Sequence, residues 1–353
     1  MLKRKGLIAA ALCGVMLLTA CSGGGESESI NDTGISVPVS SGDESVISSD
    51  ESSQSTSEDQ SSMSEDPLSS SGDPSGSSED PASTPQSSDP ITSDPEVTSS
   101  KAALIYCVDD RKTIFSENAD DPIAIASITK VLTACVALNN MDPETVITVG
   151  TEQNLVKPGS SICFIAKGQR LKLKDLISGM MIASGNDAAY TVAVAVARAR
   201  DPQKTLTDEQ AVDEFADMMN SFAKQLGMNH SHFVNPEGWD DPRQYTTASD
   251  LLLLAEYALT VPEIRENAAT YQKKVVYVSG ENAVWTNSNK LLDSESRFYN
   301  KNAVGLKTGT TNQAGCCLLA AFEREGKTYI SVVAGCESDN ERYELTKELF
   351  DMC

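Results

Sequence analysis

A change in composition near residue 100 limits which part of this chain can build a hydrophobic core. Residues 22–100 consist largely of Ser, Asp, Glu, Pro and Gly, with 17 acidic side chains and no Lys or Arg. Such a segment has too little apolar surface to offset the entropy lost on ordering, and its like charges repel one another. We therefore expect residues 21–100 to be a disordered linker. Residues 101–353 should form one folded domain, near the upper size for a single core.

The first twenty residues have the pattern of an export signal. Three basic residues at positions 3–5 precede an apolar run over residues 6–18, and small side chains follow before Cys21. The apolar run is shorter than the ~20 residues that a membrane-spanning helix needs. We therefore expect residues 1–20 to be a signal peptide that is removed.

Leu18-Thr19-Ala20-Cys21 resembles the lipobox of bacterial lipoproteins. The resemblance implies lipid attachment to the Cys21 sulfur and cleavage just before this residue. The alternative is ordinary secretion, in which Cys21 carries no lipid and has no special role. We expect an exported protein that is lipid-anchored at the outer face of the cytoplasmic membrane, with its linker reaching into the cell wall.

Charge and histidine content argue against two classes of function. The formal net charge is −23, whereas a nucleic-acid partner requires a basic surface. The only histidines, His230 and His232, have no Cys or carboxylate cluster at the spacing of metal ligands. We expect no metal site, no cofactor and no nucleic-acid partner.

Seven of the nine cysteines lie in residues 101–353. Export would permit disulfides among them, but the sequence leaves their pairing undetermined. Cys316 and Cys317 are adjacent in a run typical of a strand, so their side chains should face opposite sides of a sheet.

Hydrophobic periodicity in residues 101–353 predicts strands at both ends and helices between them. A helix should begin at Ser127 and end near Pro143. Helical patterns dominate residues 171–226, although the acidic segment 201–217 is insertion-like and hard to place. A sheet assembled from distant segments implies an α+β domain. The expected strands are 102–108 and 113–117, which should form a hairpin, and 275–279, 304–310, 315–322 and 329–335; further helices are expected at 248–259 and 341–352.

Three short motifs with chemical potential occur in order: Ser127-Ile128-Thr129-Lys130, Ser184-Gly185-Asn186 and Lys307-Thr308-Gly309. Each motif alone is weak, because each also suits an ordinary helix cap, turn or strand end. Their conjunction is strong. The first opens a helix, the second ends an apolar helix and the third lies in a strand.

The first motif contains the residues that an activated nucleophile requires. Residues three apart on a helix share one face, so Lys130 can reach the Ser127 hydroxyl. A serine needs an adjacent base, and a lysine serves only when it is neutral. Burial, the helix dipole and a second ammonium at Lys307 would each lower the pKa of Lys130. The backbone N–H of Ser127 could then stabilise an oxyanion.

The other two motifs supply groups for a peptide substrate. Ser184 can pass a proton between Lys130 and a leaving amine, and Asn186 can hydrogen-bond a substrate amide. Lys307 and Thr308 offer a cation and a hydroxyl to a terminal carboxylate. Gly309 would let a substrate backbone approach the strand closely.

The folded part resembles the low-molecular-mass D-alanyl-D-alanine carboxypeptidases, which are serine penicillin-binding proteins. Beyond the three motifs, the resemblance extends over most of residues 101–353 and is carried by the blocks Met180–Ala188, His232–Gly238, Thr247–Asp250 and Lys307–Gly315. It implies the fold of β-lactamases and DD-peptidases, an antiparallel sheet flanked by helices with a mainly helical subdomain.

The resemblance also implies a reaction. Ser127 would be acylated by the penultimate D-Ala carbonyl of a peptidoglycan pentapeptide stem, with Lys130 and Ser184 as further catalytic residues. The N–H groups of Ser127 and Thr310 would hold the oxyanion, and Arg342 would lie near the substrate carboxylate. β-Lactams would be covalent inhibitors.

Two other functions compete with this interpretation. A class A-like β-lactamase would need a carboxylate poised to activate water, and its second motif would normally read Ser-Asp-Asn rather than Ser184-Gly185-Asn186. A non-catalytic module for wall binding or penicillin sensing has no need to keep Ser127, Lys130 and Lys307 together. We therefore favour the carboxypeptidase.

Overall fold

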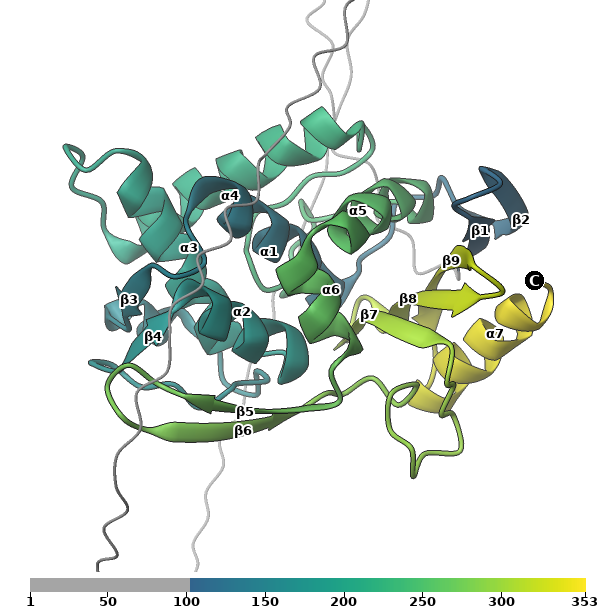
Figure 1. Cartoon of the computed structure of the whole chain (residues 1–353). Helices are drawn as coiled ribbons and strands as arrows, with labels where there is room; N and C mark the ends of the chain where they lie inside the picture. Colours follow the sequence, from purple (N-terminus) through teal and green to yellow (C-terminus); the bar gives the residue numbers. More distant parts are fainter. Residues whose placement is uncertain (1–101) are drawn as a thin grey trace, which may run out of the picture. The chain divides into compact units, whose positions relative to one another are not determined.

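A five-stranded antiparallel sheet organises residues 102–353, the part of the chain that this computed structural model describes. The first strand of the domain pairs with the last, so the two ends of the described chain meet in one sheet (Figure 1). The predicted hairpin and the three C-terminal strands are confirmed. In spatial order the strands are β2 (Lys112–Glu117), β1 (Ala102–Cys107), β9 (Lys327–Cys336), β8 (Gly315–Arg324) and β7 (Ala303–Thr311).

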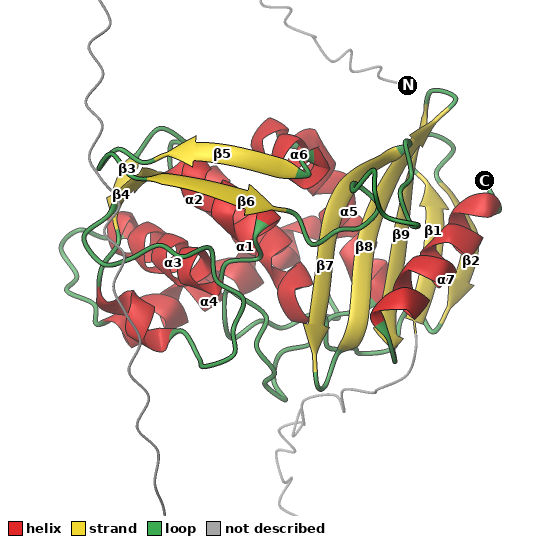
Figure 2. Ribbon diagram, turned by 90° about the horizontal axis from the view of Figure 1, so that it is seen from below, coloured by secondary structure: helices red, strands yellow, loops and turns green. Residues whose placement is uncertain are grey.

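The sheet separates two hydrophobic cores, which explains why its central strands are apolar on both faces. Successive side chains alternate between the cores: Leu104 faces the larger one and Ile105 the smaller. Cys317 and Cys316 divide in the same way, as predicted. The C-terminal helix α7 (Asp339–Asp351) closes the smaller core, where Phe350 stacks on a strand aromatic (Figure 2).

The other helices gather around the larger core, on the face of the sheet opposite α7 (Figure 1). Most of them were predicted, but the shortest, which begins with a proline, was not. No helix among residues 102–353 has the length and apolar character needed to cross a membrane. The helices are α1 (Thr129–Asn140), α2 (Leu173–Ile182), α3 (Asn186–Arg200), α4 (Asp208–Leu226), α5 (Ala248–Thr260) and α6 (Pro262–Ala269).

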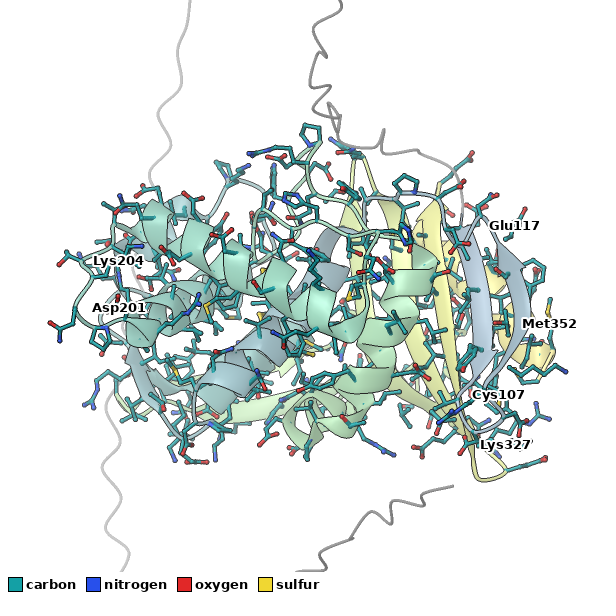
Figure 3. All side chains as sticks on the ribbon, turned by 90° about the horizontal axis from the view of Figure 1, so that it is seen from above. Cys107, Glu117, Asp201, Lys204, Lys327 and Met352 are labelled. Carbon is teal, nitrogen blue, oxygen red and sulfur yellow. The ribbon has the colours of Figure 1, made fainter. Side chains whose placement is uncertain are left out.

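The acidic segment 201–217 is partly helical. Its second part is the first half of α4, which begins with a reciprocal capping box between Thr207 and Gln210. Phe215 is buried against the core, while the acidic residues of this helix half lie mostly on its solvent face. Figure 3 shows Asp201 at the opposite end of the domain from Glu117 on the edge strand β2.

Two small hairpins complete the domain. Strands of three residues form one, and strands of five residues form the other, which covers α2. The predicted strand 275–279 was wrong in its bounds, because the chain turns at residues 277–280 to pair with a strand that was not predicted. The strands are β3 (Val146–Thr148), β4 (Arg170–Lys172), β5 (Gln272–Val276) and β6 (Asn282–Thr286).

Candidate active site

Ser127 and Lys130 meet at the start of α1. Ser127 lies in a single 3-10 turn, η1 (Ala126–Ile128), so the α-helix begins two residues later than predicted. The Lys130 Nζ donates to the Ser127 Oγ at 2.8 Å and to the backbone carbonyl of Glu237 at 2.8 Å. Burial lowers the pKa of Lys130 to about 7, although the charge of Glu237 raises it. The amine can therefore accept a proton near neutral pH.

Two glycines allow other segments to press against the backbone of the nucleophile. A Cβ on Gly309 would lie 2.5 Å from the carbonyl oxygen of Ile125 and 3.0 Å from the amide nitrogen of Ser127. Gly238 has φ +91°, and a Cβ there would lie 1.8 Å from the carbonyl oxygen of Ala126. We expected Gly309 to make room for a substrate, but the chain's own backbone occupies the space that a side chain would take.

The second motif is the turn between α2 and α3. Ser184 has φ +57°, in the left-handed region that residues other than glycine seldom adopt. Its hydroxyl accepts a hydrogen bond from the Lys307 Nζ at 3.1 Å. Asn186 is the first residue of α3, and its N–H donates to the carbonyl of Ser161 at 2.8 Å. The turn thus contributes polar contacts as well as ending a helix.

Lys307 links the sheet to the helical part of the domain. It projects from β7 and is only 1% exposed, with its Nζ donating to Ser184 and to the carbonyl of Thr308. Burial lowers its pKa well below the usual lysine value, and the charges of Lys130 and Arg342 lower it further. The two lysines therefore share one buried region, where the charge of Lys130 disfavours the positive charge of Lys307.

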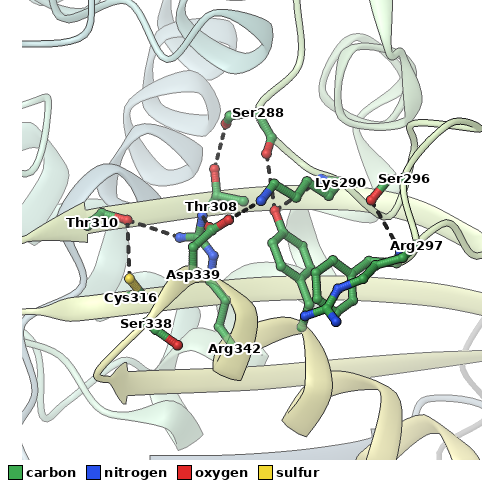
Figure 4. A network of polar contacts seen from close by, with 12 residues as sticks. Ser288, Lys290, Ser296, Arg297, Thr308, Thr310, Cys316, Ser338, Asp339 and Arg342 are labelled. Carbon is green, nitrogen blue, oxygen red and sulfur yellow. Dashed lines mark hydrogen bonds and ion pairs between the residues drawn. The ribbon is translucent and has the colours of Figure 1, made fainter.

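Arg342 holds the end of β7 from α7. Its Nη1 donates to the carbonyl of Gly309 at 3.0 Å, to the Thr310 hydroxyl at 3.0 Å and to the carbonyl of Cys317 at 3.2 Å. Asp339 binds the other terminal nitrogen of the same guanidinium (Figure 4). Arg342 is thus a buried side chain that contacts Thr310, rather than a solvated arginine at a helix start.

Asp187, which the motifs did not single out, fixes one wall of the site. Its buried carboxylate accepts hydrogen bonds from the N–H groups of Cys163 at 2.9 Å and Ile165 at 3.1 Å, and from the Cys163 thiol at 3.2 Å. These bonds tie residues 161–165 to the start of α3. The sequence feature that could have indicated a role for Asp187 is its position directly after the motif Ser184-Gly185-Asn186.

Glu237 and Tyr190 form a buried polar pair next to Lys130. The Tyr190 hydroxyl donates to Glu237 Oε1 at 2.9 Å. The other carboxylate oxygen, Oε2, is buried and has no hydrogen-bond partner among residues 102–353. The sequence drew attention to Glu237 only as part of the block His232–Gly238.

A small pocket of about 80 Å³ is bordered by Ser127. It combines predicted residues from all three motif regions with others that were not predicted individually. The buried Lys130 donates to the hydroxyl of Ser127, which lines the pocket, and the buried Lys307 donates to the hydroxyl of Ser184. The lining residues are Ser127, Gly159, Ser160, Ser161, Asn186, Glu237, Gly238, Trp239, Thr310 and Thr311.

No cluster of three or more metal-ligating side chains occurs within residues 102–353. The pocket and its neighbours bring together a serine hydroxyl, two lysines whose pKa is lowered and further hydroxyl groups. A serine hydroxyl held by a buried lysine at a helix start, on a sheet-and-helix domain of this kind, defines a serine acyl-transfer site.

Comparison with known proteins identifies the family. Residues 89–338 match the family described as D-alanyl-D-alanine carboxypeptidase, and the chain belongs to it. Its relatives include the D-alanyl-D-alanine carboxypeptidases DacF of Bacillus subtilis, 27% identical over 71% of this chain, and DacC of Escherichia coli, 32% identical over 67%. The chain spans about three fifths of these relatives, covering 61% and 57% of their lengths.

Solved structures agree with this assignment. A Streptomyces DD-transpeptidase has a TM-score of 0.64 and 27% identity, with 71% of this chain and 95% of that chain covered. A penicillin-binding protein from Listeria monocytogenes, solved in its cefotaxime-bound form, has a TM-score of 0.59 and 29% identity over 72% of this chain and 96% of that one. The predicted α+β fold of the β-lactamase and DD-peptidase type is therefore confirmed.

Proposed function

We propose that this protein is a serine-type D-Ala-D-Ala carboxypeptidase, which removes the terminal D-alanine from peptidoglycan stem peptides through an acyl-enzyme on Ser127. The observation that carries the proposal is the 2.8 Å contact between Ser127 Oγ and Lys130 Nζ, in the same buried region as Lys307. Membership of the D-alanyl-D-alanine carboxypeptidase family supports the choice of substrate.

Acylation begins with neutral Lys130, which takes the proton of the Ser127 hydroxyl. The Ser127 oxygen attacks the carbonyl carbon of the penultimate D-alanine, and the N–H groups of Ser127 and Thr310 stabilise the oxyanion. The peptide C–N bond then breaks. The leaving amine of the terminal D-alanine receives, through the Ser184 hydroxyl, the proton that Lys130 took from Ser127. The Ser184 hydroxyl also contacts Lys307.

Lys307 and Thr308 recognise the terminal carboxylate, and Asn186 hydrogen-bonds the peptide amide. Arg342 supports this role through Gly309 and Thr310, because its Nη1 donates to both. Water finally attacks the acyl carbon and gives a proton to Lys130. The ester bond to the Ser127 oxygen breaks, and Lys130 returns the proton to that oxygen. The shortened peptide is released.

A fluorescent penicillin tests the nucleophile. The purified chain should be labelled covalently, and Ser127→Ala should abolish labelling while the circular dichroism spectrum is unchanged. Release of D-alanine from a diacetyl-Lys-D-Ala-D-Ala peptide then tests the carboxypeptidase reaction. A protein that is labelled by penicillin but releases no D-alanine from this peptide would rule out the proposed substrate.

One observation favours a second candidate, a class A-like β-lactamase. Glu237 borders the Ser127 pocket and has a buried carboxylate oxygen without a partner among the described residues, which suits the activation of water. Rapid hydrolysis of penicillin without D-alanine release would favour this candidate. Slow penicillin turnover with D-alanine release would favour the carboxypeptidase.

The proposal extends to the location of the enzyme. Residues 1–20 would direct export, Cys21 would carry the lipid, and residues 21–100 would link the membrane to the catalytic domain. These residues lie outside the described part of the chain, and the support comes from their sequence alone. Replacing Cys21 by Ala should abolish incorporation of labelled fatty acid into the protein. Equal incorporation into the Cys21→Ala variant and the unaltered chain would contradict the anchor.

A further inference from the structure

A second hydroxyl lies directly beside the one assigned to carboxylate recognition. Ser288 Oγ is 2.6 Å from Thr308 Oγ1, although the two residues are 20 positions apart. Thr308 is 5% exposed, whereas Ser288 is exposed on the segment that follows β6. Ser288 was not part of any motif, and its contact with β7 arises only from the tertiary fold.

The geometry of this pair constrains what Thr308 can do. Each hydroxyl carries one hydrogen, and at 2.6 Å one of the two must donate to the other. If Thr308 donates to Ser288, its hydrogen is not available to an anion. If Ser288 donates, Thr308 accepts that bond and keeps its own hydrogen for a carboxylate. An anion near Thr308 therefore favours Ser288 as the donor.

The backbone around Ser288 is held in place by α7. The buried Tyr343 hydroxyl donates to the carbonyl of Ser288 at 3.1 Å and accepts from the N–H of Lys290 at 3.0 Å. The Lys290 ammonium also binds Asp339, at the start of α7 (Figure 4). These contacts hold the backbone from the Ser288 carbonyl to Lys290, which keeps the Ser288 hydroxyl beside β7.

The same helix turn also supports Thr310. Asp339 binds both Lys290 and Arg342, and the Arg342 Nη1 donates to the Thr310 hydroxyl at 3.0 Å. The Asp339 carboxylate therefore links two sets of contacts. Through Lys290 it holds the segment that places Ser288 beside Thr308, and through Arg342 it holds Thr310. The two hydroxyls of β7 are oriented by a single polar network from α7 and the chain after β6.

We propose that Ser288 is a positioning residue that determines specificity for a free carboxylate by orienting the Thr308 hydroxyl toward it. The inference rests on the proposed function of the site, because it concerns the carboxylate that Lys307 and Thr308 recognise. Ser288 takes no part in the transfer of the acyl group. It should therefore affect carboxylate-bearing ligands and spare those whose carboxylate is blocked.

Acylation rates measure this effect independently of peptide cleavage. The rate of covalent labelling of Ser127 would be compared for a fluorescent penicillin with a free carboxylate and for its methyl ester. We expect Ser288→Ala to lower the acid-to-ester rate ratio roughly tenfold, the loss expected for one hydrogen bond to a charged group. Ser288→Thr, which keeps the hydroxyl, should restore the ratio.

The matched control is Ser294→Ala, an exposed serine on the same segment, which should leave both rates unchanged. An unchanged ratio in Ser288→Ala, or an equal fall for acid and ester, would overturn the role of Ser288. D-Alanine release is scored separately on the same samples. Its absence alongside the expected change in the labelling ratio would reject the carboxypeptidase reaction while supporting the role of Ser288.

Discussion

The amine of Lys130 lies 2.8 Å from the hydroxyl of Ser127 and is enclosed by the fold, with no exposed surface of its own. Burial disfavours the charged form of this amine, so its pKa falls to about 7. The helix start brings the two groups together, and the surrounding core adjusts the basicity of the amine. Several predictions about activity depend on this pair.

The rate of acylation should rise with pH through about 7, as Lys130 loses its proton. Below this pH the amine is charged and unable to accept the Ser127 proton. The second-order rate of penicillin labelling from pH 5 to 10 measures this rise. A rate independent of pH between 6 and 8 would exclude Lys130 as the base.

Glu237→Gln should move the acidic limb of this profile to lower pH. The Glu237 carboxylate raises the pKa of Lys130, together with Asp187 and Cys163, so removing its charge lets the pKa fall further. Glutamine retains an oxygen that can accept from Tyr190. The same labelling series on the variant gives the measurement, with Tyr190→Phe as the control that keeps the charge. An acidic limb that stays in place or moves upward would contradict this electrostatic role.

Gly309→Ala should reduce penicillin labelling by about a hundredfold or more and destabilise the domain by roughly 1–3 kcal/mol. The new methyl group would lie 2.5 Å from the Ile125 carbonyl oxygen and 3.0 Å from the Ser127 nitrogen, which displaces the nucleophile or β7. Gly280→Ala is the comparison: its methyl group has no atom within 4 Å, so this variant should lose stability through its φ of +106° but keep normal labelling per folded molecule. Normal labelling by Gly309→Ala would show that the close approach is not needed for acylation.

Asp187→Asn should lower the free energy of unfolding by about 1–3 kcal/mol, because a neutral amide cannot accept every hydrogen bond that the buried carboxylate accepts. The segment 161–165 should loosen, since the N–H groups of Cys163 and Ile165 both donate to Asp187. Urea unfolding gives the stability, and amide hydrogen exchange in this segment gives the local effect. Unchanged exchange at Cys163 and Ile165 would show that other contacts hold this wall.

Arg342→Met should weaken penicillin labelling more than it weakens stability. The variant keeps much of the side-chain volume but loses the donors to Gly309, Thr310 and Cys317. The end of β7 would then be free to shift by the few tenths of an ångström that matter for an oxyanion donor. Labelling rate and melting temperature, measured on the same preparation, separate the two effects. A large loss of stability with normal labelling per folded molecule would assign Arg342 a purely structural role.

Local sequence determined much of this protein. Short apolar runs predict the β1–β2 hairpin and the three C-terminal strands, and helical patterns predict α1, α5 and α7. The spacing of Ser127 and Lys130 by three positions implies their contact, because one helical turn brings such residues together. Local patterns failed for the three-residue strands β3 and β4, which are too short for any period to show, and for β6.

Only the tertiary structure decided which distant residues share the site. Ser184 meets Lys307 across 123 positions, and the Glu237 carbonyl meets Lys130 across 107. The approach of Gly309 to Ser127 and the contact of Ser288 with Thr308 arise in the same way. No local rule encodes these distances, because they follow from how the sheet, the helices and the turns pack around a common core. The sequence alone therefore specifies the reactive groups, whereas packing sets their separation and their pKa.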